Sequence, residues 1–77
     1  STDSFVGRVA TITLGTARRG APAQAKLTDH LGHAHYVMVE PDADQDSLSA
    51  GDEVLLISHV GATFRAIANT SRALTDG

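Results

Sequence analysis

The segment DEVLLISHVGATFRAI, residues 52–67, decides the fold of this chain. It holds two strand-like runs, residues 52–60 and 63–67, joined by the pair Gly61-Ala62, which predicts a tight turn between two paired strands. The centre of the first run, residues 54–57, is apolar at every position, so we expect both faces of this strand to be covered.

Three further runs with strand character precede this hairpin, at residues 5–14, 23–28 and 33–40. In the first run, four apolar residues recur at period two and are expected to share the inward face: Val6, Ala10, Ile12 and Leu14. Five strand-like runs without a convincing helix predict an all-β protein, a small closed five-stranded barrel.

The connections carry turn signals. Gly32 in the turn between the second and third runs can adopt the positive φ of a hairpin, and Pro41 ends the third run because it lacks an N–H donor. Residues 15–22 and 41–53 are predicted to be loops, with Leu48 turned inward. We expect a single domain over residues 1–77, with the barrel at about 5–67 and a frayed tail at 68–77.

Composition sets the limits of this domain. Its 77 residues include 18 Val, Ile, Leu and Phe and 12 Ala, enough for one modest core but little for a deep substrate cavity. The absence of cysteine excludes disulfides and thiolate metal sites, and a net charge of −3 disfavours binding through phosphate contacts. No apolar run approaches the ~18 residues that a membrane span needs.

Two segments resemble the C-terminal domain of NfeD-like membrane proteins. The first is residues 6–14, followed by Gly20 and Pro22. A separate stretch, residues 35–41, resembles the YqiJ branch in particular. The second segment has the spacing of the family's closing hairpin at seven positions: Leu48, Gly51, Val54, Leu56, Gly61, Phe64 and Ala66.

This resemblance implies an OB-fold, a Greek-key barrel. It also implies that the domain is excised from a parent protein with transmembrane helices before Ser1. Membrane contact would then be made through those helices and not through this domain, which would lie at the cytoplasmic face of the bacterial inner membrane. Flotillin-type (SPFH) membrane scaffold proteins are the implied partners, with self-association as a further expectation. The Asp-rich loop at residues 42–46 departs from the family pattern.

That loop is the first candidate site. Three aspartates at alternating positions and a glutamate at position twelve match calcium-ligand spacing: Asp42, Asp44, Asp46 and Glu53. However, Ser47 stands where the calcium loop needs glycine, and Leu48 lies inside the segment. We favour a solvated acidic loop and predict neither a metal nor another cofactor.

Two other groups of residues are candidate sites. His33 and His35 share one face of a strand and could bind a metal only with a third ligand that no spacing identifies. Five basic residues could line a nucleic-acid-binding face, as on many OB-folds: Arg8, Arg18, Arg19, Lys26 and Arg65. Few aromatic residues accompany them, and six acidic residues between Glu40 and Glu53 would repel phosphates.

No catalytic set is visible. Ser58 and His59 are neighbours on a strand and point to opposite faces, so we predict that the chain is not an enzyme. The prediction is a non-catalytic protein-interaction module of an NfeD/YqiJ-like membrane protein, with a single-stranded nucleic-acid-binding module as the alternative. Candidate contact residues are apolar or aromatic positions that would face outward: Tyr36, Met38 and Leu55.

Overall fold

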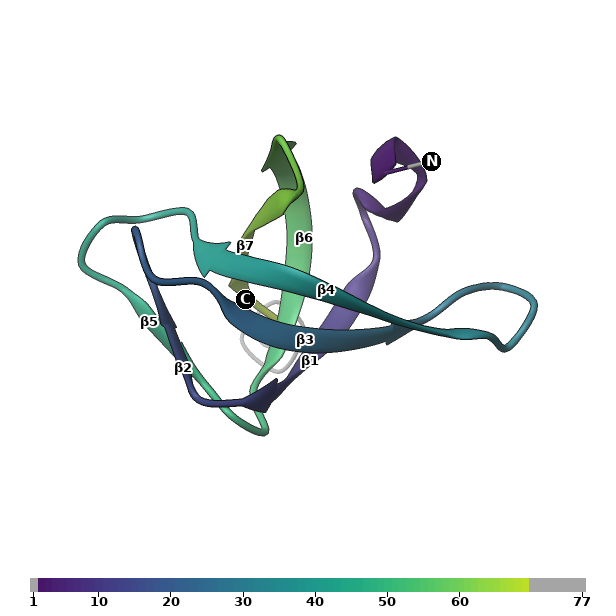
Figure 1. The fold of residues 1–77 in the computed structure, drawn as a ribbon, viewed down its shortest axis with the longest axis horizontal. Coiled ribbons are helices and arrows are strands. Elements are labelled where there is room, and N and C mark those ends of the chain that lie inside the picture. The colour runs from purple at the N-terminus through teal and green to yellow at the C-terminus, as the bar shows by residue number, and fades with distance from the viewer. Residues whose placement is uncertain (1, 70–77) are drawn as a thin grey trace, which may run out of the picture.

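The computed structural model describes residues 2–69 (Figure 1). Its elements in chain order are the 3-10 helix η1 (Thr2–Phe5) and the strands β1 (Val9–Leu14), β2 (Thr16–Arg18), β3 (Ala23–Thr28), β4 (Ala34–Pro41), β5 (Ser47–Ser49), β6 (Glu53–Val60) and β7 (Thr63–Ala68). Strands β1, β3, β4, β7 and β6 form a closed barrel in that order. They correspond to the five runs found in the sequence, which confirms the predicted all-β barrel.

The barrel has one parallel strand pair among antiparallel ones. Strand β7 pairs in parallel with β4, from Met38 opposite Thr63 to Pro41 opposite Ala66, and pairs antiparallel with β6 on its other side. Because β4 and β7 run in the same direction, the chain must cross over between them, and β5 and β6 form this crossover. The crossover gives the barrel its Greek-key order.

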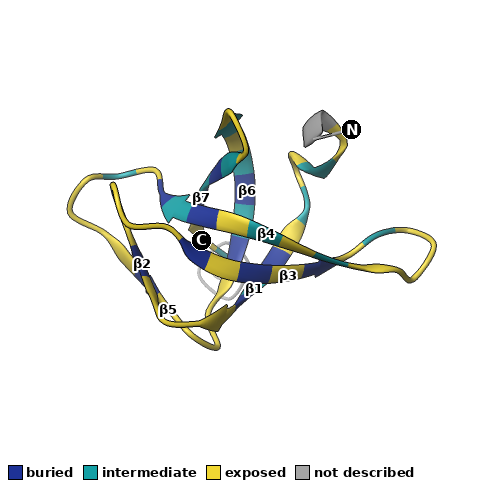
Figure 2. Ribbon diagram, in the orientation of Figure 1, coloured by how far each residue is buried: buried dark blue, intermediate teal, exposed yellow. Residues whose placement is uncertain are grey.

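The core follows the period-two pattern of the strands. Strand β3 alternates strictly between buried and exposed residues, which Figure 2 shows as alternating dark blue and yellow bands. The largest fully buried side chains are Phe64, Ile12, Leu27, Leu56, Val39, Val54 and Pro41. The inward position predicted for Leu48 is confirmed, since this residue is only 4% exposed, and Phe64 is 2% exposed.

The inward face predicted for the first run is wrong at both ends. Strand β1 begins only at Val9, so Val6 precedes the strand and is 38% exposed. At the other end the register against β3 shifts between Ile12 and Leu14, and this irregularity turns Leu14 outward to 71% exposure. A single extra residue thus moves an apolar side chain from the core to the surface.

Two predicted loops contain short strands. Strands β2 and β5 pair antiparallel, with Ala17 opposite Leu48, and both of these residues are buried. Together they form a two-stranded sheet separate from the barrel sheet (Figure 1). Three-residue strands of mostly polar composition give no detectable period, which explains why the sequence indicated only loops there.

Strand β6 departs in part from the prediction that both faces are covered. Val54 and Leu56 are fully buried, whereas Leu55 and Ile57 on the same strand are only half-buried. The outer face of the barrel therefore carries partly exposed apolar side chains.

The end of the described chain continues the barrel beyond the predicted boundary. Strand β7 reaches Ala68, and the amide of Asn69 donates to the carbonyl of Glu53 at 2.9 Å. Residues 70–77 of the predicted tail lie outside the described residues. Within residues 2–69, no helix has the length and apolar character required to cross a membrane.

Candidate functional site

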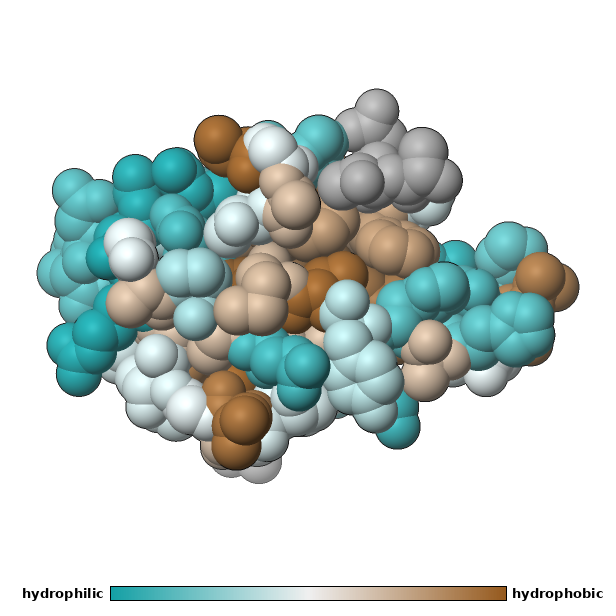
Figure 3. All heavy atoms as spheres, viewed as in Figure 1, coloured by the Kyte–Doolittle hydropathy of each residue, from teal (hydrophilic) through white to brown (hydrophobic). Residues whose placement is uncertain are grey.

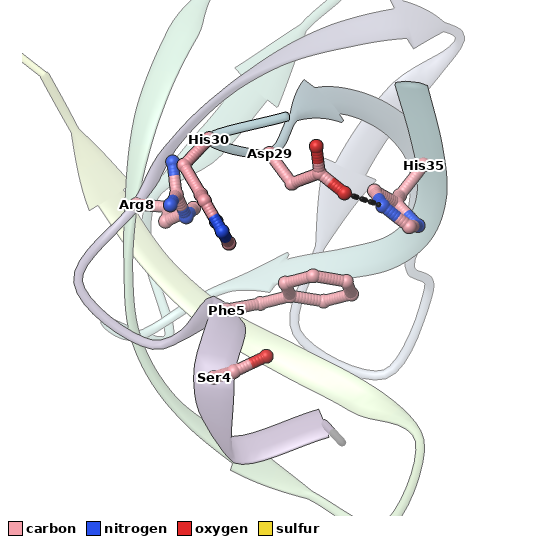
Figure 4. A pocket seen from close by; sticks show the side chains of 6 residues that line it. All are labelled: Ser4, Phe5, Arg8, Asp29, His30 and His35. Carbon is pink, nitrogen blue, oxygen red and sulfur yellow. Dashed lines mark hydrogen bonds and ion pairs between the residues drawn. The ribbon is translucent and has the colours of Figure 1, made fainter. Parts of the chain in front are cut away.

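An open pocket of about 260 Å³ lies at one mouth of the barrel, between η1 and the β3–β4 hairpin. Figure 4 shows its six lining residues: Ser4, Phe5, Arg8, Asp29, His30 and His35. The pocket combines a carboxylate, a guanidinium, two imidazoles and a phenyl ring from segments that are separated in the sequence.

Asp29 organises the hairpin side of this pocket. Its Oδ1 accepts hydrogen bonds from the amides of Leu31 and His33, both at 2.9 Å, which fixes the turn in the manner of an Asx-turn. Its Oδ2 lies 2.7 Å from Nε2 of His35 and 3.9 Å from Nδ1 of His33. The hydrogen bond with His35, followed by the one from the His33 amide, holds the pKa of Asp29 well below its usual range.

Phe5 connects η1 to the barrel. Its ring centroid lies 4.9 Å from that of His35 and 6.2 Å from that of Phe64, with both ring pairs tilted. Aromatic pairs at such separations add to the stabilisation that burial provides. Phe5 thus packs one wall of the pocket against the buried core.

Arg8 enters the pocket from the segment that leads into β1. The backbone on either side of it is tied to β6, because the amide of Gly7 donates to the carbonyl of Leu56 and the amide of Leu56 donates to the carbonyl of Arg8. The guanidinium makes one long hydrogen bond, 3.5 Å from Nη1 to the carbonyl oxygen of Thr28. Figure 4 shows Arg8 and His30 side by side, apart from the Asp29–His35 pair.

One of the two histidines that the sequence singled out, His35, lines the pocket, whereas His33 lies just before β4 and is not part of the lining. Both imidazoles lie near Oδ2 of Asp29, at 2.7 Å for His35 and 3.9 Å for His33. In the part of the chain that the structure describes, no group of three potential ligands is placed to hold a metal ion. The sequence pattern did not predict that Phe5, Arg8 and Asp29 line one pocket, and it offered Arg8 only as one cation of a nucleic-acid-binding face. The local signal for Asp29 is its position just before a turn and four residues before His33.

The acidic residues considered for calcium have separate partners. Asp44 forms an ion pair with Arg19 at 2.9 Å, while the carboxylate of Glu53 accepts a hydrogen bond from Asn69 at 3.2 Å. The structure therefore does not assemble Asp42, Asp44, Asp46 and Glu53 into one ligand set.

The basic residues are also dispersed. Glu40 binds both Arg19 at 3.4 Å and Arg65 at 3.1 Å, so two of the five predicted cations are already paired with an acid. The Ser58-His59 pair points to opposite faces: Ser58 lies opposite Arg65 in the sheet, whereas the ring of His59 is 5.8 Å from that of buried Phe64.

The predicted contact residues divide between two outer surfaces. Tyr36 and Met38 are two residues apart and share the outer face of β4, where they are 60% and 40% exposed. Leu55 lies on β6 between Val9 and Ile67, which are its register partners on the two neighbouring strands. The structure brings Tyr36 and Met38 together but places Leu55 in a different apolar group.

Met38 lines an apolar groove of about 350 Å³ with residues of β1, β3 and their connection: Leu14, Gly15, Thr16, Pro22, Ala23 and Gln24. Strand register explains this grouping, because Leu14 lies opposite Gln24, and Gln24 lies opposite Met38. Figure 3 shows brown, apolar residues over the middle of this view, flanked by polar residues on either side. We call this groove together with Tyr36 the β3–β4 face.

Comparisons with known proteins agree with the fold. The family model described as "Inner membrane protein YqiJ, OB-fold" matches residues 4–67. A crystal structure of the soluble domain of a membrane protein implicated in regulation of membrane protease activity, from Corynebacterium glutamicum, superimposes with a TM-score of 0.71. It shares 18% sequence identity, and the alignment covers 87% of this chain and 95% of that one. None of the curated proteins matches the chain.

Proposed function

This chain belongs to the YqiJ OB-fold family of inner membrane proteins, and from this premise we propose that it is a non-catalytic protein-interaction domain. The domain lies at the cytoplasmic face of the inner membrane, tethered by transmembrane helices of its parent protein. Its partner is a flotillin-type (SPFH) scaffold protein in the same membrane.

The observation that carries this proposal is the β3–β4 face. The barrel interior is filled by side chains such as Phe64 and Leu56, while Leu14, Tyr36 and Met38 remain exposed outside. Apolar and aromatic side chains on a polar-rimmed surface are typical of the core of a protein interface. The groove between Leu14 and Met38 offers a recess in which a partner's apolar side chain could be buried.

Nucleic acid is a less well supported ligand. Arg19 and Arg65 both form ion pairs with Glu40. The exposed aromatic residue Tyr36 has one cation beside it on β3, its register partner Lys26. Single-strand binding needs a continuous basic groove with several stacking rings. The described surface does not group its cations and aromatic rings in this way.

A pull-down tests the proposal. The domain and its full-length parent are each immobilised and exposed to the purified flotillin-type protein of the same organism. We expect capture of the flotillin-type protein by the parent, and loss of this capture when Tyr36→Glu and Met38→Glu are combined. Leu31→Glu, at the exposed hairpin tip, is the matched control and should leave capture unchanged. If neither the domain nor the parent captures the scaffold protein, the proposed partnership is wrong.

A further inference from the structure

We propose that the pocket at the barrel mouth is a binding site for a carboxylate group, anchored by the guanidinium of Arg8. This site goes beyond the interaction function, since it shares no lining residue with the groove of the β3–β4 face. Its ligand class is a small organic acid whose body packs on an aromatic ring.

The guanidinium of Arg8 differs from those of the other half-buried arginines in its partners. Two other arginines with comparable burial are paired with carboxylates, Arg19 with Glu40 and Asp44, and Arg65 with Glu40. Arg8 is half-buried in the pocket, yet among the described side chains of residues 4–69 its guanidinium has no carboxylate partner and only the 3.5 Å contact with the Thr28 carbonyl. A partly dehydrated guanidinium presents a planar fork of donors that matches a carboxylate in bidentate geometry.

Asp29 is engaged elsewhere and does not pair with Arg8. It is the one acid among the described residues that line the pocket, and its oxygens already accept from the amides of Leu31 and His33 and from the ring of His35. Those bonds hold the hairpin turn together, so they cannot be released without loosening the turn. Arg8 therefore keeps its donors available inside the pocket.

The walls of the pocket carry different groups on its two sides. Figure 4 shows Arg8 and His30 on one side of the opening and the Asp29–His35 pair on the other, and the Phe5 ring lies below that pair, with its centroid 4.9 Å from that of the His35 ring. An acid that enters on the Arg8 side can also accept a hydrogen bond from His30, while its apolar body lies on Phe5. Asp29 lies on the opposite side of the opening, where its oxygens are engaged by the hairpin amides and by His35.

The volume of the pocket is suited to a small organic acid. A volume of about 260 Å³ is several times the ~30 Å³ that one water molecule occupies, so the pocket has room for an acid with an aromatic or short aliphatic body. A metal ion is the less suitable occupant, because the described residues contain no set of three ligands for it.

The test is an NMR titration of the ¹⁵N-labelled 77-residue chain with sodium phenylacetate at constant ionic strength. Benzyl alcohol serves as a neutral probe of similar shape. We expect saturable shifts of the Arg8, His30 and His35 signals with phenylacetate, and at least about tenfold weaker binding of benzyl alcohol.

Variants separate the guanidinium from general charge. Arg8→Gln should weaken phenylacetate binding by about tenfold or more, and Arg8→Lys by less, because lysine keeps the charge but not the fork. Arg18→Gln removes an exposed cation outside the pocket and should leave binding unchanged. The spectrum of each variant reports whether the barrel is folded.

The proposal is overturned if the shifts do not saturate, if benzyl alcohol binds as well as phenylacetate, or if Arg18→Gln and folded Arg8 variants behave alike. These results would leave the flotillin-type partnership untouched, because that partnership is tested by a different measurement on a different surface.

Discussion

Asp29 and His35 face each other at the turn end of the β3–β4 hairpin, with 2.7 Å between Oδ2 of Asp29 and Nε2 of His35. The same carboxylate accepts two backbone amides of the turn, so one side chain fixes both the turn and the orientation of a pocket-lining histidine. The hairpin and the barrel mouth should therefore respond together when this pair is changed.

Asp29→Asn tests the contribution of the charge. Asparagine keeps an acceptor oxygen for the two amides but removes the anion beside His35. Because hydrogen bonding lowers the pKa of Asp29 in the folded state, its stabilisation is present above the ordinary value of ~3.9 and is lost as the pH falls below it.

Urea unfolding across a pH series measures this effect. The wild type should be more stable than Asp29→Asn at pH 7, and the difference should shrink below about pH 4. Asp46→Asn is the control, because this exposed acid makes no side-chain hydrogen bond or ion pair with the described residues. A constant difference between the wild type and Asp29→Asn at all pH values would refute the role of the charge.

Phe5→Ala tests the attachment of η1 to the barrel. Truncation of a fully buried phenylalanine to alanine lowers the free energy of unfolding by ~3–5 kcal/mol, and for half-buried Phe5 we expect a loss of about 1–2 kcal/mol. Chemical denaturation gives this value, and the His35 ring signals should shift as the neighbouring ring is lost. Val60→Ala, at a 62% exposed position, should change stability by less than ~0.5 kcal/mol. Equal effects of the two changes would show that Phe5 does not anchor η1.

Leu48→Ala tests whether the small β2–β5 sheet is part of the core. Leu48 is 4% exposed and lies opposite buried Ala17, so its truncation should cost about 2–4 kcal/mol of unfolding free energy. Leu31→Ala removes the same atoms from a 68% exposed position and should be nearly neutral. A loss below ~1 kcal/mol at Leu48 would mean that the sheet packs only loosely on the barrel.

Glu40→Gln tests the ion-pair network that joins Arg19 and Arg65. Only 13% of the Glu40 side chain is exposed, and both guanidinium groups lie within 3.4 Å of its Oε1. We expect a loss of about 1 kcal/mol that shrinks at high salt. Asp44→Asn, whose side chain is 84% exposed, should lose less than ~0.5 kcal/mol. A larger loss at Asp44 than at Glu40 would contradict the central place of Glu40.

The strands were predictable because apolar and polar residues alternate along them, as in β3, and because the turn at Gly61 is short. The outward position of Leu14 was not predictable, because the register shift after Ile12 depends on pairing with β3. The alternation of apolar and polar residues along β1 does not reveal this shift. The pocket depends on contacts between distant segments. Nothing in the spacing of Phe5, Arg8 and Asp29 shows that they meet, whereas His33 and His35, at the start of β4, are two residues apart, and this spacing alone predicts that they lie on one side of the chain.

The most direct test of the proposed interaction is the affinity of the full-length parent for its flotillin-type partner, measured for the wild type and for a variant altered on the β3–β4 face. The parent is immobilised on a sensor surface, in detergent or nanodiscs, and binding of the flotillin-type protein is measured. Tyr36→Ala combined with Met38→Ala should weaken this binding by about tenfold or more, as expected for loss of an interface core. Val9→Ala combined with Ile67→Ala, on the other apolar surface, should have little effect. Binding that is absent in the wild type, or unchanged by loss of Tyr36 and Met38, would contradict the account.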